Sequence, residues 1–283
     1  MGFTLKNNFQ TQSGFLNLNV NSNPTFTISY IVVGGGGGAG NNYTYDQASG
    51  GGAGGFLTGS LNWASGITFV ATRGLYGAVG LNDDIFSYAG SNGGNSSLVY
   101  SGNTILAYGG GGGGSGDFNG GNGGSGGGSG SIGSAPTGVI GQGNNGGVMN
   151  NGTGEGAGGG GAGSIGGDPF YDPNTDTDYS GIGGIGLASS ITGSSIIYSV
   201  GGSGVGSNAN PSNPPFWGNA GSGGNLQSTG QGNVLGNGFN GVVIISIPST
   251  KYTGLITGSP SVTPDGSGNT ILTWNGLSGT YIS

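Results

Sequence analysis

Acidic and amide side chains alternate in one short loop, and their spacing suits metal chemistry. Within residues 168–178, Asp172, Asn174, Asp176 and Asp178 occupy every second position. Oxygen ligands at loop positions one, three, five and seven are typical of a Ca²⁺ site. The sixth position, however, holds threonine where an EF-hand needs glycine, and no glutamate follows at position twelve. Two interpretations stay open: a Ca²⁺ site and a solvated acidic loop.

Other residues offer little support for catalysis. The chain has no histidine and no cysteine, which excludes histidine-based triads, thiol chemistry, disulfides and the usual zinc sites. GGSGG around Ser125 fits a nucleophile elbow and GEGAGG at 154–159 fits a dinucleotide fingerprint, but glycine-rich sequence produces such matches by chance. Asp83 and Asp84 are adjacent, so they favour a turn over a facing glycosidase pair. We expect no enzyme and, apart from the Ca²⁺ alternative, no cofactor.

Glycine determines which elements can position any such residues. It accounts for 77 of the 283 residues and for more than half of the stretch 109–167. Neither a helix nor a strand tolerates that density, so two states remain: a disordered linker, or polyglycine II helices packed side by side. Further glycine-rich runs lie at 34–40, 50–55, 181–186, 218–224 and 230–241.

Packed polyglycine II helices can satisfy their own backbone, because each N–H remains free to donate to a neighbouring helix. Only such a repeated hydrogen-bond network offsets the entropy of ordering so much glycine. A strict Gly-X-Y repeat is missing, which excludes collagen. We therefore expect an all-β and irregular fold: a bundle of polyglycine II helices with flanking short β-strands and almost no α-helix.

The segments outside the glycine runs predict conventional strands. Apolar and polar residues alternate at 15–20, and the segment 25–33 alternates and then runs continuously apolar. The apolar run 242–247 ends at Pro248. We expect 242–247 to pair with 28–33 and close the domain, and 56–108 to supply a β core. The predicted division is an N-terminal β segment for attachment, 1–33; a glycine-rich domain, 34–248; and a C-terminal β appendage, 249–283.

Composition excludes several partners. Only 5% of residues are charged and the net charge is −7, so phosphate neutralisation of nucleic acid has no basis. No apolar stretch approaches the roughly 20 residues of a membrane helix, and the N-terminus lacks the pattern of a signal peptide. We expect a protein made in the host cytoplasm that leaves the cell by virion assembly and lysis.

The order of these segments resembles the glycine-rich domains of tailed-phage tail-fibre adhesins and of related surface fibre proteins of double-stranded DNA viruses. The resemblance covers roughly 28–248 and depends most on YIVVGGGGG, GLASSITGSS and GVVIISIP, in that order. It implies a sandwich of polyglycine II strands whose end loops bind a host surface receptor. The tail NTILTWNGLSGTYIS departs from the pattern, because such a strand pair often precedes the domain and here follows it.

Carried over by position, the resemblance implies receptor contacts in the non-glycine loops. Aromatic residues in such loops can also simply cap the open end of the bundle, and both interpretations stay open. The candidate receptor-binding residues are Tyr43, Tyr45, Phe170, Tyr171, Tyr179, Phe216 and Trp217.

These expectations combine into a virion surface protein, a tail-fibre or fibre-tip adhesin for host attachment. Its partners would be other virion proteins, a host receptor or glycan and further copies of itself, with no nucleic acid and no membrane insertion. Two alternatives remain: a capsid or filament building block with the bundle as a rigid spacer, and an ice-binding protein. Regular threonine rows, which ice binding would favour, are missing.

Overall fold

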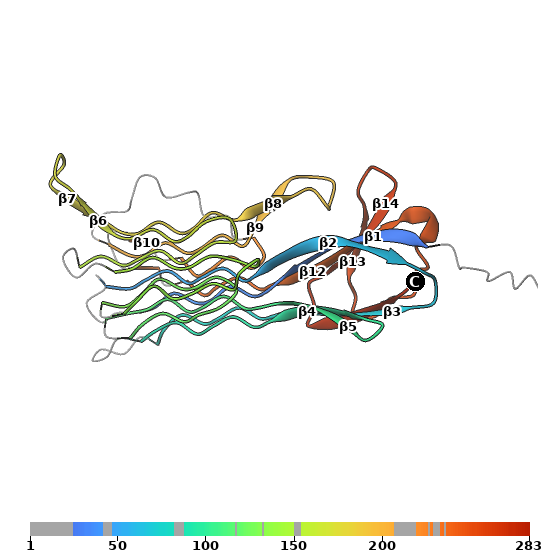
Figure 1. The fold of residues 1–283 in the computed structure, drawn as a ribbon, viewed down its shortest axis with the longest axis horizontal. Helices are drawn as coiled ribbons and strands as arrows, with labels where there is room; N and C mark the ends of the chain where they lie inside the picture. The colour runs from blue at the N-terminus through green and yellow to red at the C-terminus, as the bar shows by residue number, and fades with distance from the viewer. Residues whose placement is uncertain are drawn as a thin grey trace, which may run out of the picture.

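The computed structural model describes residues 25–41, 47–81, 88–116, 118–131, 133–149, 154–206, 219–225, 227–228, 233–234 and 236–283. This part of the chain is elongated and has two regions arranged end to end (Figure 1). The head is a β-sandwich formed by residues 26–33, 56–72, 96–107 and 242–283. The glycine bundle consists of the extended runs described within 34–55, 73–95, 108–186 and 199–241.

The first sheet of the head has five antiparallel strands in the order β13-β14-β12-β1-β2. Its central pair confirms the expected closure of the domain, because Ser29 to Val33 pair in register with Ser246 to Val242. The strand bounds are β1 Phe26–Val33, β2 Phe56–Trp63, β12 Val242–Pro248, β13 Ser261–Pro264 and β14 Asn269–Trp274.

The second sheet has four antiparallel strands in the order β15-β3-β4-β5. A short 3-10 turn, η1 (Ser249–Lys251), leads from β12 into the C-terminal segment, and it is the only helical element among the described residues. This agrees with the expectation of almost no helix. The strand bounds are β3 Thr68–Thr72, β4 Ser96–Tyr100, β5 Asn103–Ala107 and β15 Ser278–Ile282.

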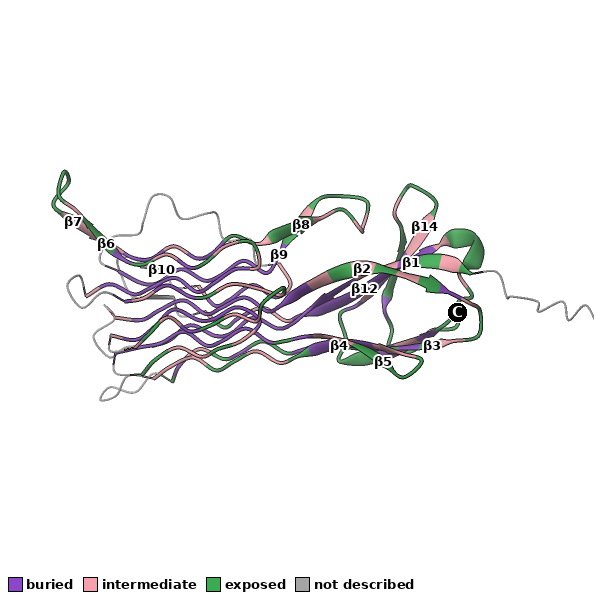
Figure 2. Cartoon of the chain, viewed as in Figure 1, coloured by how far each residue is buried: buried purple, intermediate pink, exposed green. Residues whose placement is uncertain are grey.

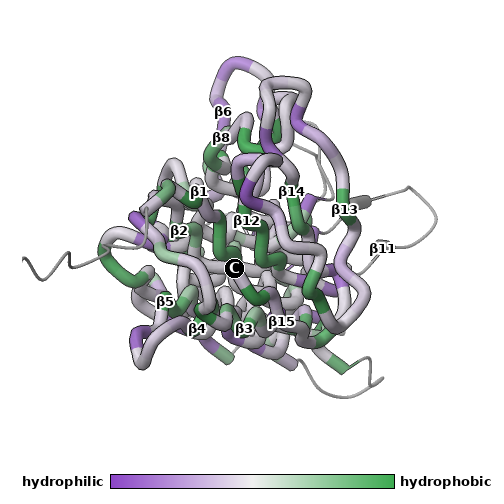
Figure 3. Tube along the Cα trace, turned by 90° about the vertical axis from the view of Figure 1, so that its right-hand side faces the viewer, coloured by the Kyte–Doolittle hydropathy of each residue, from purple (hydrophilic) through white to green (hydrophobic). Residues whose placement is uncertain are grey.

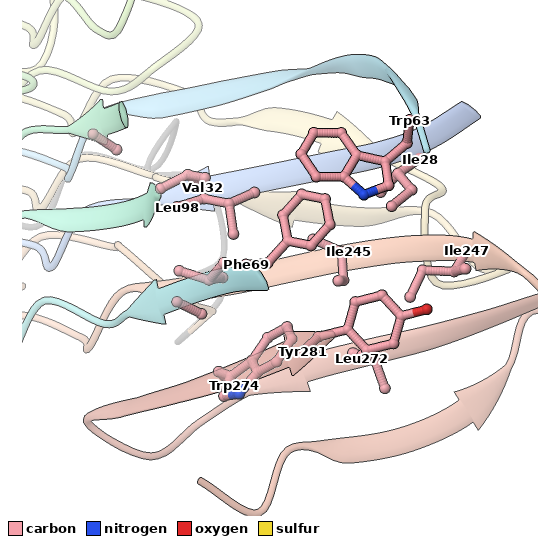
Figure 4. Close-up of a cluster of buried hydrophobic side chains, with 13 residues drawn as sticks. Ile28, Val32, Trp63, Phe69, Leu98, Ile245, Ile247, Leu272, Trp274 and Tyr281 are labelled. Atoms are coloured by element: carbon pink, nitrogen blue, oxygen red, sulfur yellow. The ribbon is translucent and has the colours of Figure 1, made fainter. Parts of the chain in front are cut away.

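Large apolar side chains from both sheets fill the space between them (Figure 4). Trp63 and Phe69 have ring centroids 4.1 Å apart, and Phe69 also stacks with Tyr281. The Trp63 indole N–H donates to Ser283 Oγ over 2.8 Å, so the polar edge of the ring is satisfied inside the core. Residues 56–108 supply part of this core, as their apolar pattern predicted.

The five-stranded sheet is covered on its other face as well. Ile31, Val33 and Ile244 pack there with Tyr198, which belongs to a hairpin of β8 (Leu187–Ser189) and β9 (Ile196–Tyr198). Strands buried on both faces need apolar residues at consecutive positions, which explains why β1 ends in the apolar run YIVV and β12 begins with VVII.

The C-terminal segment contributes to both sheets of the head. β14 pairs with β12, and β15 pairs with β3 some two hundred positions earlier in the chain. The predicted boundary at Pro248 therefore falls between two strands of one sheet. Figure 3, which looks toward the C-terminus, shows β14, β12, β3 and β15 within the same compact cross-section. The strand predicted at 15–20 lies outside the described residues.

In the glycine bundle, every third N–H group along residues 34–41 donates to the same neighbouring run. Gly34, Gly37 and Gly40 donate to the carbonyls of Gly55, Gly52 and Ser49, respectively. Gly35, Gly38 and Asn41 donate to the carbonyls of Gly94, Ser91 and Tyr88. Gly36 and Ala39 donate to the carbonyls of Phe239 and Gly236. Each series steps back by three residues in its acceptor run, with N···O distances of 2.8–3.1 Å. A helix of three residues per turn produces this pattern, as polyglycine II requires.

The bundle needs glycine because there is no room for a side chain between its runs. A Cβ added to Gly37 would meet the carbonyl of Gly111, and one added to Gly51 would meet that of Gly37, both far inside the 3.4 Å of ordinary contact. None of the glycines in 34–40 or 50–55 has a positive φ. Space alone therefore selects glycine in these runs. Figure 2 shows the buried residues concentrated along the inner runs.

At two buried positions of the bundle, a serine hydroxyl joins the hydrogen-bond network. Ser49 Oγ donates to the Ser129 carbonyl over 2.7 Å and accepts the Ala157 N–H over 2.9 Å. Ser129 Oγ in turn accepts the Met149 N–H. These hydroxyls add to the direct backbone bonds between the same runs, such as Gly128 N–H to the Gly50 carbonyl, so further buried backbone donors keep a partner.

Asparagine has the corresponding role on the outer runs. Asn92 and Asn95, three residues apart, accept the N–H groups of Gly112 and Gly109. The same spacing recurs in Asn237 and Asn240, which accept from Val79 and Tyr76. One turn of a polyglycine II helix separates the two members of each pair. Each amide thus supplies an acceptor that a missing neighbour run would have provided.

Candidate binding pole

The glycine runs end close together at the side of the bundle farthest from the head. The Asn41 N–H donates to the Tyr88 carbonyl, its side-chain amide donates to the Leu81 carbonyl, and the Gly116 N–H donates to the Gln47 carbonyl. Segments far apart in sequence are therefore neighbours here. We call this end the pole; its described residues are Asn41, Gln47, Leu81, Tyr88, Gly116, Phe118 and 168–180.

A two-stranded hairpin projects from the pole (Figure 1). It consists of β6 (Phe170–Asp172) and β7 (Thr177–Tyr179), joined by a turn. Asp168 fixes its base, since one carboxylate oxygen accepts the Val148 N–H over 2.6 Å. Within its two strands Phe170 and Tyr171 are exposed, and the other residues are half-buried.

Two aromatic residues of the hairpin are largely exposed: Phe170 at 46% and Tyr171 at 50%. Phe170 packs against Tyr179, with ring centroids 5.3 Å apart. Tyr171 lies on the opposite face of the hairpin, because cross-strand partners share a face and Tyr171 pairs with Asp178. The structure therefore places all three predicted aromatic residues of this loop together, on both faces of one small hairpin.

Hydrogen bonds fix the acidic side chains of the hairpin. The Tyr171 hydroxyl donates to Asp176 Oδ1 over 2.8 Å, and this bond to a carboxylate raises the pKa of Tyr171. Asp172 Oδ1 accepts the backbone N–H of Asn174 over 2.9 Å and its side-chain amide over 3.1 Å. These bonds lower the pKa of Asp172. The carboxylates therefore stabilise the turn and its tyrosine.

The four predicted cation ligands do not converge in this arrangement. Asp172 pairs with Thr177 and Asp178 pairs with Tyr171, so the two carboxylates lie on opposite faces of the hairpin. In the described ranges, no group of three or more acidic, histidine or cysteine residues could hold a metal ion. Ca²⁺ binding at 168–178 stays a prediction, and it requires the turn to rearrange.

Four of the predicted receptor-binding residues, Tyr43, Tyr45, Phe216 and Trp217, lie outside the described residues. The run 34–41, which precedes Tyr43 and Tyr45 in the sequence, reaches the pole at Asn41. The adjacent acids Asp83 and Asp84 also lie outside the described residues.

Sequence reasoning missed three apolar residues at the pole, of which Phe118 and Leu81 are exposed and Tyr88 is half-buried. Tyr88 and Phe118 stack with ring centroids 6.4 Å apart and nearly parallel planes, and Leu81 is 70% exposed. Each lies at the end of a glycine run, directly beside an interruption in it. That position, a large apolar residue at the last or first turn of a run, is the signal that could have identified them.

The formal enzyme motifs fall inside the lattice. Ser125 is fully buried in the bundle, and its hydroxyl has no hydrogen-bond partner among the described residues. Residues 154–159 continue as an extended run and open no helix. Ser125 and residues 154–159 are therefore part of the packed bundle. In the described part of the chain, no helix is long and apolar enough to cross a membrane.

Head and bundle together define an all-β protein in which a short antiparallel sandwich continues into a polyglycine II lattice. The chain belongs to the family of the glycine-rich domain, whose family model matches residues 11–248. The match includes β1, β12 and every glycine run between them, and it ends at Pro248, the last residue of β12. A search of curated proteins finds no match.

Proposed function

We propose that this chain is a surface structural protein of a double-stranded DNA virus, acting as a tail-fibre or fibre-tip adhesin that binds a host receptor. The function is noncatalytic: the bundle holds the loops of the pole outward, and the head provides attachment to other virion proteins. Several copies on one particle would raise the overall affinity through avidity.

One observation supports this proposal most: the exposed aromatic hairpin lies at one end of the molecule, and residues 25 and 283, the first and last described residues, lie at the other. Phe26 pairs with Trp63, and Trp63 bonds to Ser283, so both ends of the described chain meet at the far side of the head. Phe170 and Tyr171 lie beyond the other end of the bundle (Figure 1). Attachment at one end and contact at the other is what a fibre tip requires.

The chemistry of the pole also favours recognition. Exposed tyrosine and phenylalanine side chains supply large contact areas at a low cost in conformational entropy. Residues of this type dominate the binding energy of protein interfaces. Interactions within the hairpin hold these side chains, since the Tyr171 hydroxyl donates to Asp176 and Phe170 packs against Tyr179. Preorganisation of this kind lowers the entropy lost on binding.

Binding of the purified, labelled chain to cells of the virus's host tests the proposal. The double variant Phe170→Ala, Tyr171→Ala should bind at least tenfold more weakly with an unchanged melting temperature, since both side chains are exposed. Val262→Ala, exposed on β13 in the head, serves as the control and should bind like the wild type. Equal binding by the double variant and the control would contradict receptor contact by the hairpin.

A specific surface feature favours a second candidate, the building block of a capsid or filament. Ile165, Ile182 and Ile185 line a shallow groove on the side of the bundle, and Leu187 is exposed next to it. Apolar exposure of this kind is typical of contact surfaces. Concentration-dependent sedimentation that Ile185→Ser abolishes would favour the building block, whereas a monomer at all concentrations would argue against it.

A further inference from the structure

A second concave site lies on the flank of the glycine bundle, apart from the pole. Four runs contribute to this flank groove, and its volume is about 310 Å³. That volume is at the lower end of the range of small-ligand sites, roughly 300–1,000 Å³. The side chains that line it are Asn92, Asn95, Tyr108, Asn122, Thr137 and Val139.

The amide groups of the flank groove are fixed by the lattice. Asn95 Oδ1 accepts the Gly109 N–H over 2.9 Å, and Asn122 Oδ1 accepts the Thr137 N–H over 2.7 Å. Their amide nitrogens have no hydrogen-bond partner among the described residues, although both side chains are exposed. Because the oxygen of each amide is held, its N–H donors keep a constant direction. The groove thus presents preorganised donors.

Tyr108 adds an aromatic surface to these donors. Its side chain is 41% exposed, while its backbone is held on both sides. The N–H donates to Gln142 Oε1 over 2.9 Å and the carbonyl accepts the Gly55 N–H over 2.8 Å. The backbone of Tyr108 is therefore held at the groove, which this residue lines together with Asn95, Asn122 and Val139.

Charge and polarity narrow the ligand class. None of the lining residues is charged, so phosphates, carboxylates and cations find no opposite charge. A purely apolar ligand would leave the amide donors buried without partners, which is costly. A sugar ring offers both matching features: hydroxyl oxygens that accept from amides, and a C–H face that packs on an aromatic ring.

We propose that the flank groove binds a neutral glycan, with one hexose ring packed on Tyr108 and its hydroxyl oxygens accepting from the amides of Asn95 and Asn122. This site shares no residue with the pole. Its existence does not depend on the proposed adhesin function, and loss of one would leave the other intact.

A panel of neutral hexasaccharides tests the proposal on the full chain. The panel contains α- and β-linked glucose, mannose, galactose and N-acetylglucosamine oligomers, titrated by calorimetry and by backbone amide NMR. At least one should bind with Kd tighter than about 1 mM and shift the amide signals of 92–95, 108–109 and 137–139. No binding by any of them, or shifts confined to other residues, would overturn the proposal.

Three variants separate recognition from folding. Tyr108→Ala should weaken binding at least tenfold. Asn95→Asp and Asn122→Asp keep the oxygen that accepts the lattice N–H but replace the amide donor, so binding should fall roughly tenfold each while the melting temperature stays constant.

Asn240→Asp is the matched control, since Asn240 Oδ1 accepts the Tyr76 N–H outside the groove. It should bind the glycan like the wild type. An equal loss of binding in Asn240→Asp, or full binding by Asn122→Asp, would show that the groove amides are structural only.

Discussion

The head and the glycine bundle solve the same problem by opposite means. The head buries large side chains between two sheets, and its backbone bonds follow the alternating pattern of antiparallel strands. The bundle buries backbone against backbone, and three successive residues of a run such as 34–41 donate to three different neighbouring runs. Stability in the head comes mainly from removing apolar area from water, and in the bundle from hydrogen bonds and close packing without side chains. Removing side-chain atoms should therefore destabilise the head, and adding side-chain atoms should destabilise the bundle.

The largest effect is expected from deleting a core ring of the head. Trp274 is fully buried between the sheets, so Trp274→Ala should lower the free energy of unfolding by roughly 3–5 kcal/mol. Urea-induced unfolding measures it. Leu277→Ala, on the exposed turn that follows, should stay within about 0.5 kcal/mol of the wild type. A loss below 1 kcal/mol in Trp274→Ala would mean that the head contributes little to stability.

Adding a single carbon to the bundle should cost almost as much. The new Cβ in Gly37→Ala would overlap the backbone of Gly111, which cannot rotate away as a side chain could, so we expect a loss of about 3 kcal/mol. In Gly141→Ala the added carbon meets nothing within 4 Å, and only the positive φ of 80° costs about 1 kcal/mol. The reverse order of the two losses would contradict the packing argument.

A smaller effect is expected from removing one hydroxyl inside the lattice. Ser49→Ala leaves the buried Ala157 N–H without its acceptor, which should cost about 1–3 kcal/mol. Ser91→Ala, exposed on an outer run, is the matched control and should change stability by less than about 0.5 kcal/mol. Amide hydrogen exchange at Ala157 locates the effect. Unchanged protection of that amide in Ser49→Ala would exclude the hydroxyl as its partner.

The smallest effect is expected at low pH, where Asp265 becomes protonated. In the turn between β13 and β14, Asp265 accepts hydrogen bonds from the side-chain amide of Asn269 and from the backbone N–H groups of Asn269 and Ser267, and these bonds lower the pKa of Asp265. At pH values above the ordinary aspartate pKa of 3.8, the ionised side chain of Asp265 therefore stabilises the folded state. This stabilisation is lost as the pH falls through the lower pKa of the folded state. Melting temperatures should show this step in the wild type and not in Asp265→Asn.

Asp172, whose pKa is also lowered, provides the contrast in the other region. Its bonds stabilise only the turn of a hairpin that projects from the pole. Asp172→Asn should therefore leave the dependence of the melting temperature on pH unchanged. A step that disappears in Asp172→Asn and persists in Asp265→Asn would reverse the assignment.

The sequence predicted the fold well where the residue pattern is local. The glycine runs indicated polyglycine II packing, and the apolar runs at 28–33 and 242–247 indicated a buried pair, confirmed by the register of β1 and β12. The integration of β14 and β15 into the head was not foreseen, because their pairing partners depend on topology that no local pattern encodes. The role of serine and asparagine within the lattice likewise depends on which runs become neighbours.

The sequence identified the loop that forms the candidate site but not the contacts between the residues of the site. The aromatic residues of 168–180 were identified because they interrupt glycine, and the structure brings Phe170 and Tyr179 together. Tyr88 and Phe118 were missed because each belongs to a run that looks structural in the sequence. The alternating acids suggested a ligand loop, but the hairpin register, which sequence spacing alone does not fix, separates Asp172 from Asp178.

The direction of the glycine runs has a mechanical consequence. The described runs lie along the long axis of the molecule (Figure 1), between the ends of the described chain in the head and the hairpin at the pole. A pull between these two ends acts along the runs and therefore loads the lateral hydrogen bonds in shear, many at once. A peeling force would instead open them one at a time. The bundle should therefore resist tension along its axis far better than a force applied across it.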